Sequence, residues 1–290
     1  MKKLFTLVAV ALASLVSLQA QEEAPASNWT KKNVSGINLS QTSLSNWAAG
    51  GENSVSWNVY LNSIANYKKD KWSWDNGLVA DFGQTYTSSN KWQKSVDKLN
   101  LNTKAGYALS KHWNAALLLD FLTQFDLGYK SAASRAAGDK YISKFLSPGY
   151  VTLALGADYK PNQNFSLLLS PATGKLTIVA DDYLSSIGAY GVAPGKHLLA
   201  EIGASVVANY NTNLTKDISL VTKLTLFSAY NHNFGNVDVN WDLMLNFKVN
   251  KYITANFTTN LVYDDDIKSA SGGPKVQLRQ MLGLGAVYTF

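Results

Sequence analysis

Residues 54–82, SVSWNVYLNSIANYKKDKWSWDNGLVADF, alternate between apolar and polar side chains. Odd positions from 55 to 67 are mainly apolar or aromatic, and even positions from 54 to 66 are mainly polar. Because successive side chains of an extended strand point to opposite faces, such a segment has one apolar and one polar face. The polar run 68–71 separates this segment from the next alternating one. The stretch therefore predicts a β-hairpin with a tight turn.

The same alternation recurs along most of the chain, most clearly at 113–125, 237–249 and 253–263, where every second residue is mainly apolar. Residues 171–174 (PATG) interrupt one segment and are either a bulge or a turn, because proline removes a donor from a strand ladder. The pattern predicts an all-β antiparallel transmembrane barrel of about 12 strands. We expect strands near 34–44, 54–68, 71–86, 96–110, 112–127, 147–160, 164–180, 197–211, 217–231, 236–250, 252–265 and 275–290.

The predicted connections alternate in length. Those near 68–71, 110–112, 160–164, 211–217 and 249–252 are mostly short, whereas those near 44–54, 86–96, 128–146, 181–197, 231–236 and 265–275 are mostly longer. Short periplasmic turns and longer outer loops are typical of outer-membrane barrels. A secreted β-sandwich also alternates, but its strands are usually shorter and fewer.

Aromatic residues lie beside the predicted short turns, where a barrel carries its interfacial girdle. This set comprises Tyr67, Trp72, Trp74, Trp113, Tyr159, Phe165, Tyr210 and Tyr288. The last strand ends in Tyr288 and Phe290, which share one face. Such an ending resembles the C-terminal signal that the barrel-assembly machinery reads, so we expect that machinery as a partner during biogenesis.

The N-terminus predicts export. Lys2 and Lys3 precede an apolar run at 4–18, and the small residues Ser17 and Ala20 indicate cleavage before Gln21. The alternative, a retained anchor, needs a longer apolar run. We therefore expect a signal peptide at 1–20, a periplasmic segment at 21–33 and a barrel at 34–290 in the bacterial outer membrane, in contact with its lipid and lipopolysaccharide.

Composition excludes several functions. The chain has no cysteine, which rules out disulfides, thiolate metal sites and a lipid-modified N-terminal cysteine. The formal net charge is +6, and the lysines are scattered, so nucleic acid is not an expected partner.

Four segments resemble an uncharacterised family of bacterial outer-membrane barrels that is classed only as a domain of unknown function. They are 41–53 (QTSLSNWAAGGEN), 165–179, 239–241 (VNW) and 263–268 (YDDDIK). The resemblance extends over roughly 33–290. It implies a barrel and an outer-membrane location, and it brings no activity, cofactor or site residue.

The histidine, serine and acidic residues form no convincing catalytic constellation, so we expect that the chain is not an enzyme and uses no cofactor. A barrel phospholipase needs His and Ser on one outward face, but Ser110 and His112 fall in a predicted turn. His197, His232 and the acidic pair 181–182 fall near outer loops, as a barrel protease would require, although acidic loop residues are usually solvated surface. The run Asp264, Asp265 and Asp266 offers oxygen ligands for a divalent cation but lacks the spacing of a dedicated loop.

Charged residues on the polar face are the better candidates for function. We expect seven to face the lumen, namely Lys104, Asp120, Glu201, Lys223, Asp242, Lys248 and Arg279. Counting across hairpins places Lys104 opposite residue 118 and Lys223 opposite residue 244, so Asp120 and Asp242 become their diagonal neighbours.

Two interpretations of these charges remain open. In the leading one, the polar lumen is a passive channel for small hydrophilic solutes. In the alternative, the same charges form ion pairs that stabilise a plugged barrel with a structural or surface-interaction role. The loops at 128–146 and 181–197 are long enough to contribute a plug. A barrel hydrolase is the third hypothesis.

Overall fold

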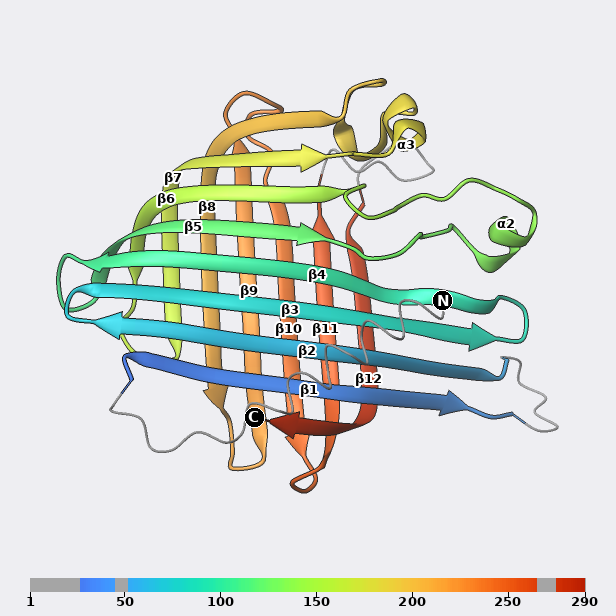
Figure 1. Cartoon of the computed structure of the whole chain (residues 1–290), viewed down its shortest axis with the longest axis horizontal. Helices are drawn as coiled ribbons and strands as arrows, with labels where there is room; N and C mark the ends of the chain where they lie inside the picture. Colours follow the sequence, from blue (N-terminus) through green and yellow to red (C-terminus); the bar gives the residue numbers. More distant parts are fainter. Residues whose placement is uncertain (1–26, 45–51, 265–274, 290) are drawn as a thin grey trace.

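The computed structural model describes residues 27–44, 52–264 and 275–289. Twelve antiparallel strands form one closed barrel. In Figure 1 the tilted strands of the front wall run across those of the back wall. The strands are β1 (Trp29–Thr42), β2 (Ser54–Lys69), β3 (Trp72–Thr87), β4 (Lys91–Ala108), β5 (Trp113–Thr123), β6 (Gly149–Tyr159), β7 (Phe165–Ile178), β8 (Leu198–Asn213), β9 (Ile218–Ala229), β10 (Asp238–Lys248), β11 (Ile253–Tyr263) and β12 (Gln277–Thr289). In the described parts of the long loops lie three short helices, namely α2 (Ala132–Ala136), α3 (Asp182–Ser186) and the 3-10 helix η1 (Ala189–Gly191). The predicted fold class is therefore confirmed.

The barrel closes where the first strand meets the last. Residues from Val34 to Leu39 of β1 pair with residues from Thr289 back to Leu284 of β12. β1 begins at Trp29 rather than near residue 34, because Trp29 and the four residues after it pair with β2 as far as Tyr67. Part of the segment predicted to precede the barrel is therefore strand.

The connection between β3 and β4 also differs from the prediction. A longer loop was expected at 86–96, but β4 begins at Lys91 and only residues 88–90 separate the two strands. The rings of Tyr86 and Trp92 lie 5.5 Å apart across the hairpin. Aromatic cross-strand pairs of this kind stabilise a sheet, which accounts for the extended hairpin.

The structure places a bulge at 171–174. β7 continues through this segment, and its register against β8 shifts between Ser170 and Thr173. The Ser170 hydroxyl donates to the carbonyl of Leu155 at 2.8 Å and accepts from the Thr173 hydroxyl at 2.8 Å, so side chains replace lost ladder bonds. Pro171 has no N–H to leave unpaired at the break.

The outer wall of the barrel is apolar. Eight outward leucine and isoleucine side chains are 41–66% exposed, namely Leu101, Leu117, Leu119, Leu153, Leu155, Ile202, Leu282 and Leu284. So large an apolar surface is unfavourable in water and favourable in lipid. None of the helices in the described part of the chain is long and apolar enough to span a bilayer.

Aromatic residues form a girdle at the short-turn end, as predicted. Ring pairs there include Trp72 with Tyr107 at 4.9 Å and Trp113 with Tyr159 at 4.9 Å. Their amphipathic rings mark the boundary between lipid tails and headgroups. Tyr288 is outward-facing and half exposed in β12, whereas Phe290 lies outside the described residues.

The long loops pack on one another at the other end. Val179, Leu184 and Val192 form a buried apolar cluster, against which Tyr141 and Tyr190 pack. Figure 1 shows α2 and α3 beyond the ends of β5 and β7. These loops therefore extend the barrel at its long-loop end.

The bulge generates a testable requirement for glycine at position 156. A Cβ added to Gly156 would overlap the Leu169 carbonyl oxygen across the hairpin, whereas one added to Gly174 would have no atom within 4 Å. We expect Gly156→Ala to lower the free energy of unfolding by about 1–3 kcal/mol, as overpacking does. Urea unfolding in detergent micelles, followed by tryptophan fluorescence, measures this. Equal stability of the Gly156→Ala and Gly174→Ala variants would contradict it.

Candidate functional site

Three groups of charged side chains project from the strands into the lumen, and we name them by their position. The short-turn cluster comprises Asp75, Lys104, Asp158 and Lys160. The middle cluster comprises Lys98, Asp120, Lys223 and Asp242. The long-loop cluster comprises Lys175, Glu201, Asp238 and Asp264.

The short-turn cluster is built around a buried carboxylate. Asp158 is only 2% exposed and lies 2.8 Å from the Lys104 ammonium and 3.5 Å from that of Lys160. Lys160 also donates to Asp75 at 2.6 Å, and Lys104 donates to the Ser166 hydroxyl at 3.0 Å. Pairing of this kind compensates for the desolvation of the charges.

The middle cluster joins opposite walls of the barrel. Lys98 of β4 donates to Asp242 of β10 at 3.0 Å, and these strands lie six places apart in either direction around the closed sheet. Lys223 of β9 donates to Asp120 of β5 at 3.2 Å. The two walls must therefore approach within reach of one lysine and one aspartate, and the ion pairs cross the lumen at this level.

Amide side chains fix the carboxylates of the middle cluster. Asn260 donates to the second oxygen of Asp242 at 2.7 Å, and Asn100 donates to Asp120 at 3.0 Å. The four charged side chains of the cluster are nevertheless 18–36% exposed. Water therefore reaches this level of the lumen, so the crossing is narrow and hydrated.

The long-loop cluster gathers three carboxylates around one lysine. The Lys175 ammonium lies 2.6 Å from Asp238, 3.3 Å from Glu201 and 3.7 Å from Asp264. Lys175 and Glu201 are almost buried, with side chains 12% and 3% exposed. The cluster carries more negative than positive charge at its end of the lumen.

The structure confirms one of the two predicted registers and shows ion pairs other than the predicted ones. Lys104 lies opposite Leu118, as expected, but its ion pair is with Asp158. The register predicted for Lys223 is wrong, because it lies directly opposite Asp242 rather than residue 244. Hairpin counting considers adjacent strands only, whereas lysine side chains reach across the lumen.

The remaining predicted charges occupy different settings. Glu201 joins the long-loop cluster, Arg279 is partly buried on β12, and Lys248 is exposed where β10 ends at a short turn. Sequence reasoning missed Lys98 although it has the same even parity as Lys104 on β4. It also missed Lys175, because the bulge before it reverses the inward parity of β7.

The loop candidates for other chemistry are partly described. Asp264 contacts Lys175, whereas Asp265 and Asp266 lie outside the described residues. Within the described part of the chain, no three His, Asp or Glu side chains are grouped to hold a metal ion. His197 lies 3.7 Å from Asp182, whose side chain is fully exposed.

Asp181 anchors the two long loops to each other. It accepts hydrogen bonds from the Tyr141 hydroxyl at 2.7 Å, from the Lys144 ammonium at 3.0 Å and from the Leu184 N–H at 3.1 Å, where it caps α3. Burial raises the pKa of this carboxyl, but these bonds and the Lys144 charge outweigh burial and lower it from 3.8 to about 2. The anchor therefore stays ionised well into the acid range.

Comparison with known proteins supports the resemblance predicted from the sequence. Residues 39–129, about a third of the chain, match the family described as "Protein of unknown function (DUF3078)". The comparison with curated proteins found no match.

Solved outer-membrane barrels are similar in architecture. An outer-membrane channel from Pseudomonas putida F1 is 12% identical, with 94% of this chain and 100% of that chain covered and a TM-score of 0.41. The NanC porin is 7% identical, with 89% and 97% covered and a TM-score of 0.38. The translocator domain of the autotransporter NalP from Neisseria meningitidis is 8% identical, with 100% and 98% covered and a TM-score of 0.38. Values this low transfer no solute and no residue role to this chain.

The short-turn cluster predicts a large effect from one carboxylate. Asp158→Asn removes the charge that lies between Lys104 and Lys160, so we expect the free energy of unfolding to fall by about 3–5 kcal/mol, as for other broken buried pairs. Urea unfolding in micelles measures it. Asp217→Asn, in an exposed pair with Lys216 at 3.9 Å, is the matched control and should leave stability unchanged. Equal effects of the two variants would show that Asp158 is not a structural anchor.

The loop anchor predicts a pH dependence. Because the pKa of Asp181 is lower in the folded state than its ordinary 3.8, its stabilisation is complete above pH 3.8 and is lost as the pH falls through about 2. Removing the helix cap in Asp181→Ala costs at least about 1 kcal/mol, so protection of the Leu184 amide from hydrogen exchange should fall about fivefold or more. Unchanged protection in this variant above pH 3.8 would refute the anchor.

Proposed function

We propose that this barrel is a gated passive channel for small hydrophilic solutes in the bacterial outer membrane, with its short turns in the periplasm. The observation that carries the proposal is the middle cluster, where Lys98 and Asp242 meet across the lumen at 3.0 Å yet remain partly exposed to water. A dry, packed crossing would favour a structural barrel. A hydrated crossing held by ion pairs favours a passage that narrows at one level.

The lumen wall carries hydrogen-bonding amide side chains at the level of this crossing. Asn58, Asn100 and Asn260 donate amide N–H groups to Asp81, Asp120 and Asp242, respectively. Polar walls with both signs of charge suit neutral or weakly charged solutes, because they replace hydration without a one-signed barrier.

Gating follows from the strength of the crossing pairs. Opening a path past the middle cluster requires Lys98 and Lys223 to leave Asp242 and Asp120. Partly hydrated pairs are weaker than buried ones, because water screens the attraction. We therefore expect the unmodified channel to open briefly and with small conductance.

Single-channel recording in planar bilayers tests the proposal. The double variant Asp120→Asn/Asp242→Asn keeps side-chain size but releases both lysines, so openings should become longer and larger. The freed positive charges should also shift the reversal potential in a salt gradient toward anion selectivity. Asp217→Asn, at an exposed turn outside the lumen, is the control and should behave like the unmodified protein.

The alternative, a plugged structural barrel, makes the opposite prediction. If the unmodified protein and the double variant are both folded and both silent in the bilayer, the lumen is no pathway and the channel proposal fails. Long-loop contacts would then become the place to look for a surface partner.

A further inference from the structure

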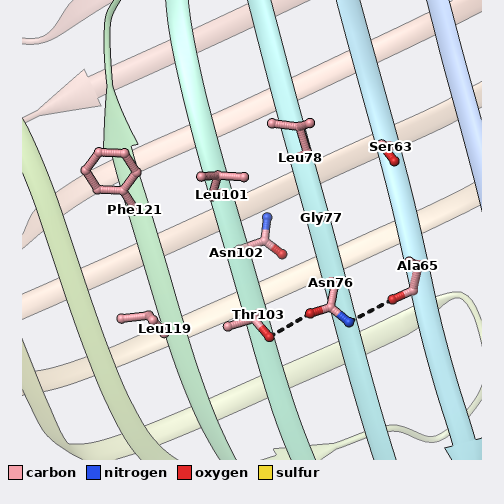
Figure 2. Close-up of a pocket in the computed structure, with 10 residues that line it drawn as sticks. All are labelled: Ser63, Ala65, Asn76, Gly77, Leu78, Leu101, Asn102, Thr103, Leu119 and Phe121. Atoms are coloured by element: carbon pink, nitrogen blue, oxygen red, sulfur yellow. Dashed lines mark hydrogen bonds between the residues drawn. The ribbon is translucent and has the colours of Figure 1, made fainter. Parts of the chain in front are cut away.

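The lipid-facing wall carries a row of polar side chains across β1 to β4. On this outer face the Ser63 hydroxyl donates to Asn33, and the Asn76 amide donates to the Ala65 carbonyl at 3.0 Å. The Thr103 hydroxyl donates to Asn76 at 2.7 Å and accepts from the Trp74 indole at 2.6 Å. Figure 2 shows Asn76 linked to Thr103 on one side and to Ala65 on the other. Polar groups in lipid are costly, so such a row needs an explanation.

The row forms the floor of a depression in the wall. Its volume is about 450 Å³; Leu78, Leu101 and Phe121 border it on the side toward the long loops, and Leu119 lies beside Thr103 (Figure 2). The outward side chains Ser63, Ala65 and Thr103 are shorter than this border, which hollows the surface. The depression therefore combines a polar floor with an apolar border on the lipid-facing side.

The depth of the row in the membrane follows from β4, whose outward residues run Tyr107, Ala105, Thr103 and Leu101 away from the short turn. Tyr107 belongs to the aromatic girdle, where it meets Trp72. Thr103 is four residues further along, roughly 9 Å along the membrane normal for a strand tilted about 45° with a rise of about 3.3 Å per residue. The row therefore lies about 9 Å inside the girdle, beside the upper part of the acyl chains.

The turn below the row is strongly basic. Lys68, Lys69 and Lys71 lie at the β2–β3 turn, all exposed, with Asp70 as the one acid among them. The Lys71 ammonium lies 5.9 Å above the Tyr107 ring centroid, which places a positive charge at the girdle on the lipid side. Lysines near a membrane surface attract anionic lipid headgroups.

We propose that the outer face of β2 to β5 binds an anionic phospholipid of the periplasmic leaflet. Lys69 and Lys71 bind the phosphate, and the depression beyond them receives the upper part of an acyl chain against Leu101, Leu119 and Phe121. The basic turn and the depression follow one another from the short turn along β3 and β4 in the order in which phosphate and acyl chain occur in the lipid. The proposal is independent of whether the lumen conducts.

The test is native mass spectrometry of the full barrel in micelles, titrated separately with phosphatidylglycerol and phosphatidylethanolamine. We expect preferential retention of phosphatidylglycerol. Lys71→Gln should weaken phosphatidylglycerol binding about fivefold, since one surface lysine contributes about 1 kcal/mol. Thr103→Val removes one hydroxyl of the polar floor at nearly constant shape and breaks its hydrogen bonds with Asn76 and Trp74, so the floor should rearrange and bind both lipids more weakly.

The matched control is Lys251→Gln. Lys251 lies 4.7 Å above the Tyr252 ring at another short turn, and so repeats the lysine–tyrosine pair without the polar row. It should bind phosphatidylglycerol like the unmodified barrel. Equal retention of the two lipids by the unmodified protein, or equal effects of Lys71→Gln and Lys251→Gln, would overturn the proposal. If the unmodified barrel instead formed dimers without bound lipid, and Thr103→Val abolished them, the depression would be the contact site of a second copy of the chain.

Discussion

Satisfaction of backbone hydrogen bonds within lipid is the constraint on which this structure depends. No water is available in the hydrocarbon to pair with a free N–H or carbonyl, so a sheet in the membrane must close on itself. Pairing of β1 with β12 supplies that closure. Closure then assigns every strand one face toward lipid and one toward the lumen, and the alternation in the sequence becomes an apolar wall around a charged interior.

The charged interior is organised by level rather than by strand. Near the short turns, the buried carboxylate of Asp158 lies between two lysines, of which Lys104 is also largely buried. At mid-height, Lys98 and Asp242 connect opposite walls in partial contact with water. The same chemistry therefore favours rigidity at one level and exchange with solvent at the other, and the difference lies in the burial of the central carboxylate.

Period-two alternation was enough to predict the strand count, most strand bounds and the inward face, because lipid and lumen select opposite side chains at every step. It could not predict which charges pair. Lys98 was visible on the inward face of β4, but its partner lies on the opposite wall, beyond any hairpin count. Lys175 was hidden by the bulge at residues 171–174, which shifts the register without changing the composition. The polar row on the outer wall was equally hidden, because Asn76 and Thr103 look like ordinary breaks in alternation until their strands are placed side by side.

The joint between β1 and β12 has a mechanical consequence. Among the described residues it contains six paired positions, whereas β1 and β2 share fourteen. The N-terminal end of β1 and the C-terminal end of β12 both lie at the short-turn end. The barrel is therefore closed by one short strand pair between two longer hairpins. Because this joint has the fewest paired positions, we expect a load on the ring to open it first and to leave the hairpins paired in an open sheet.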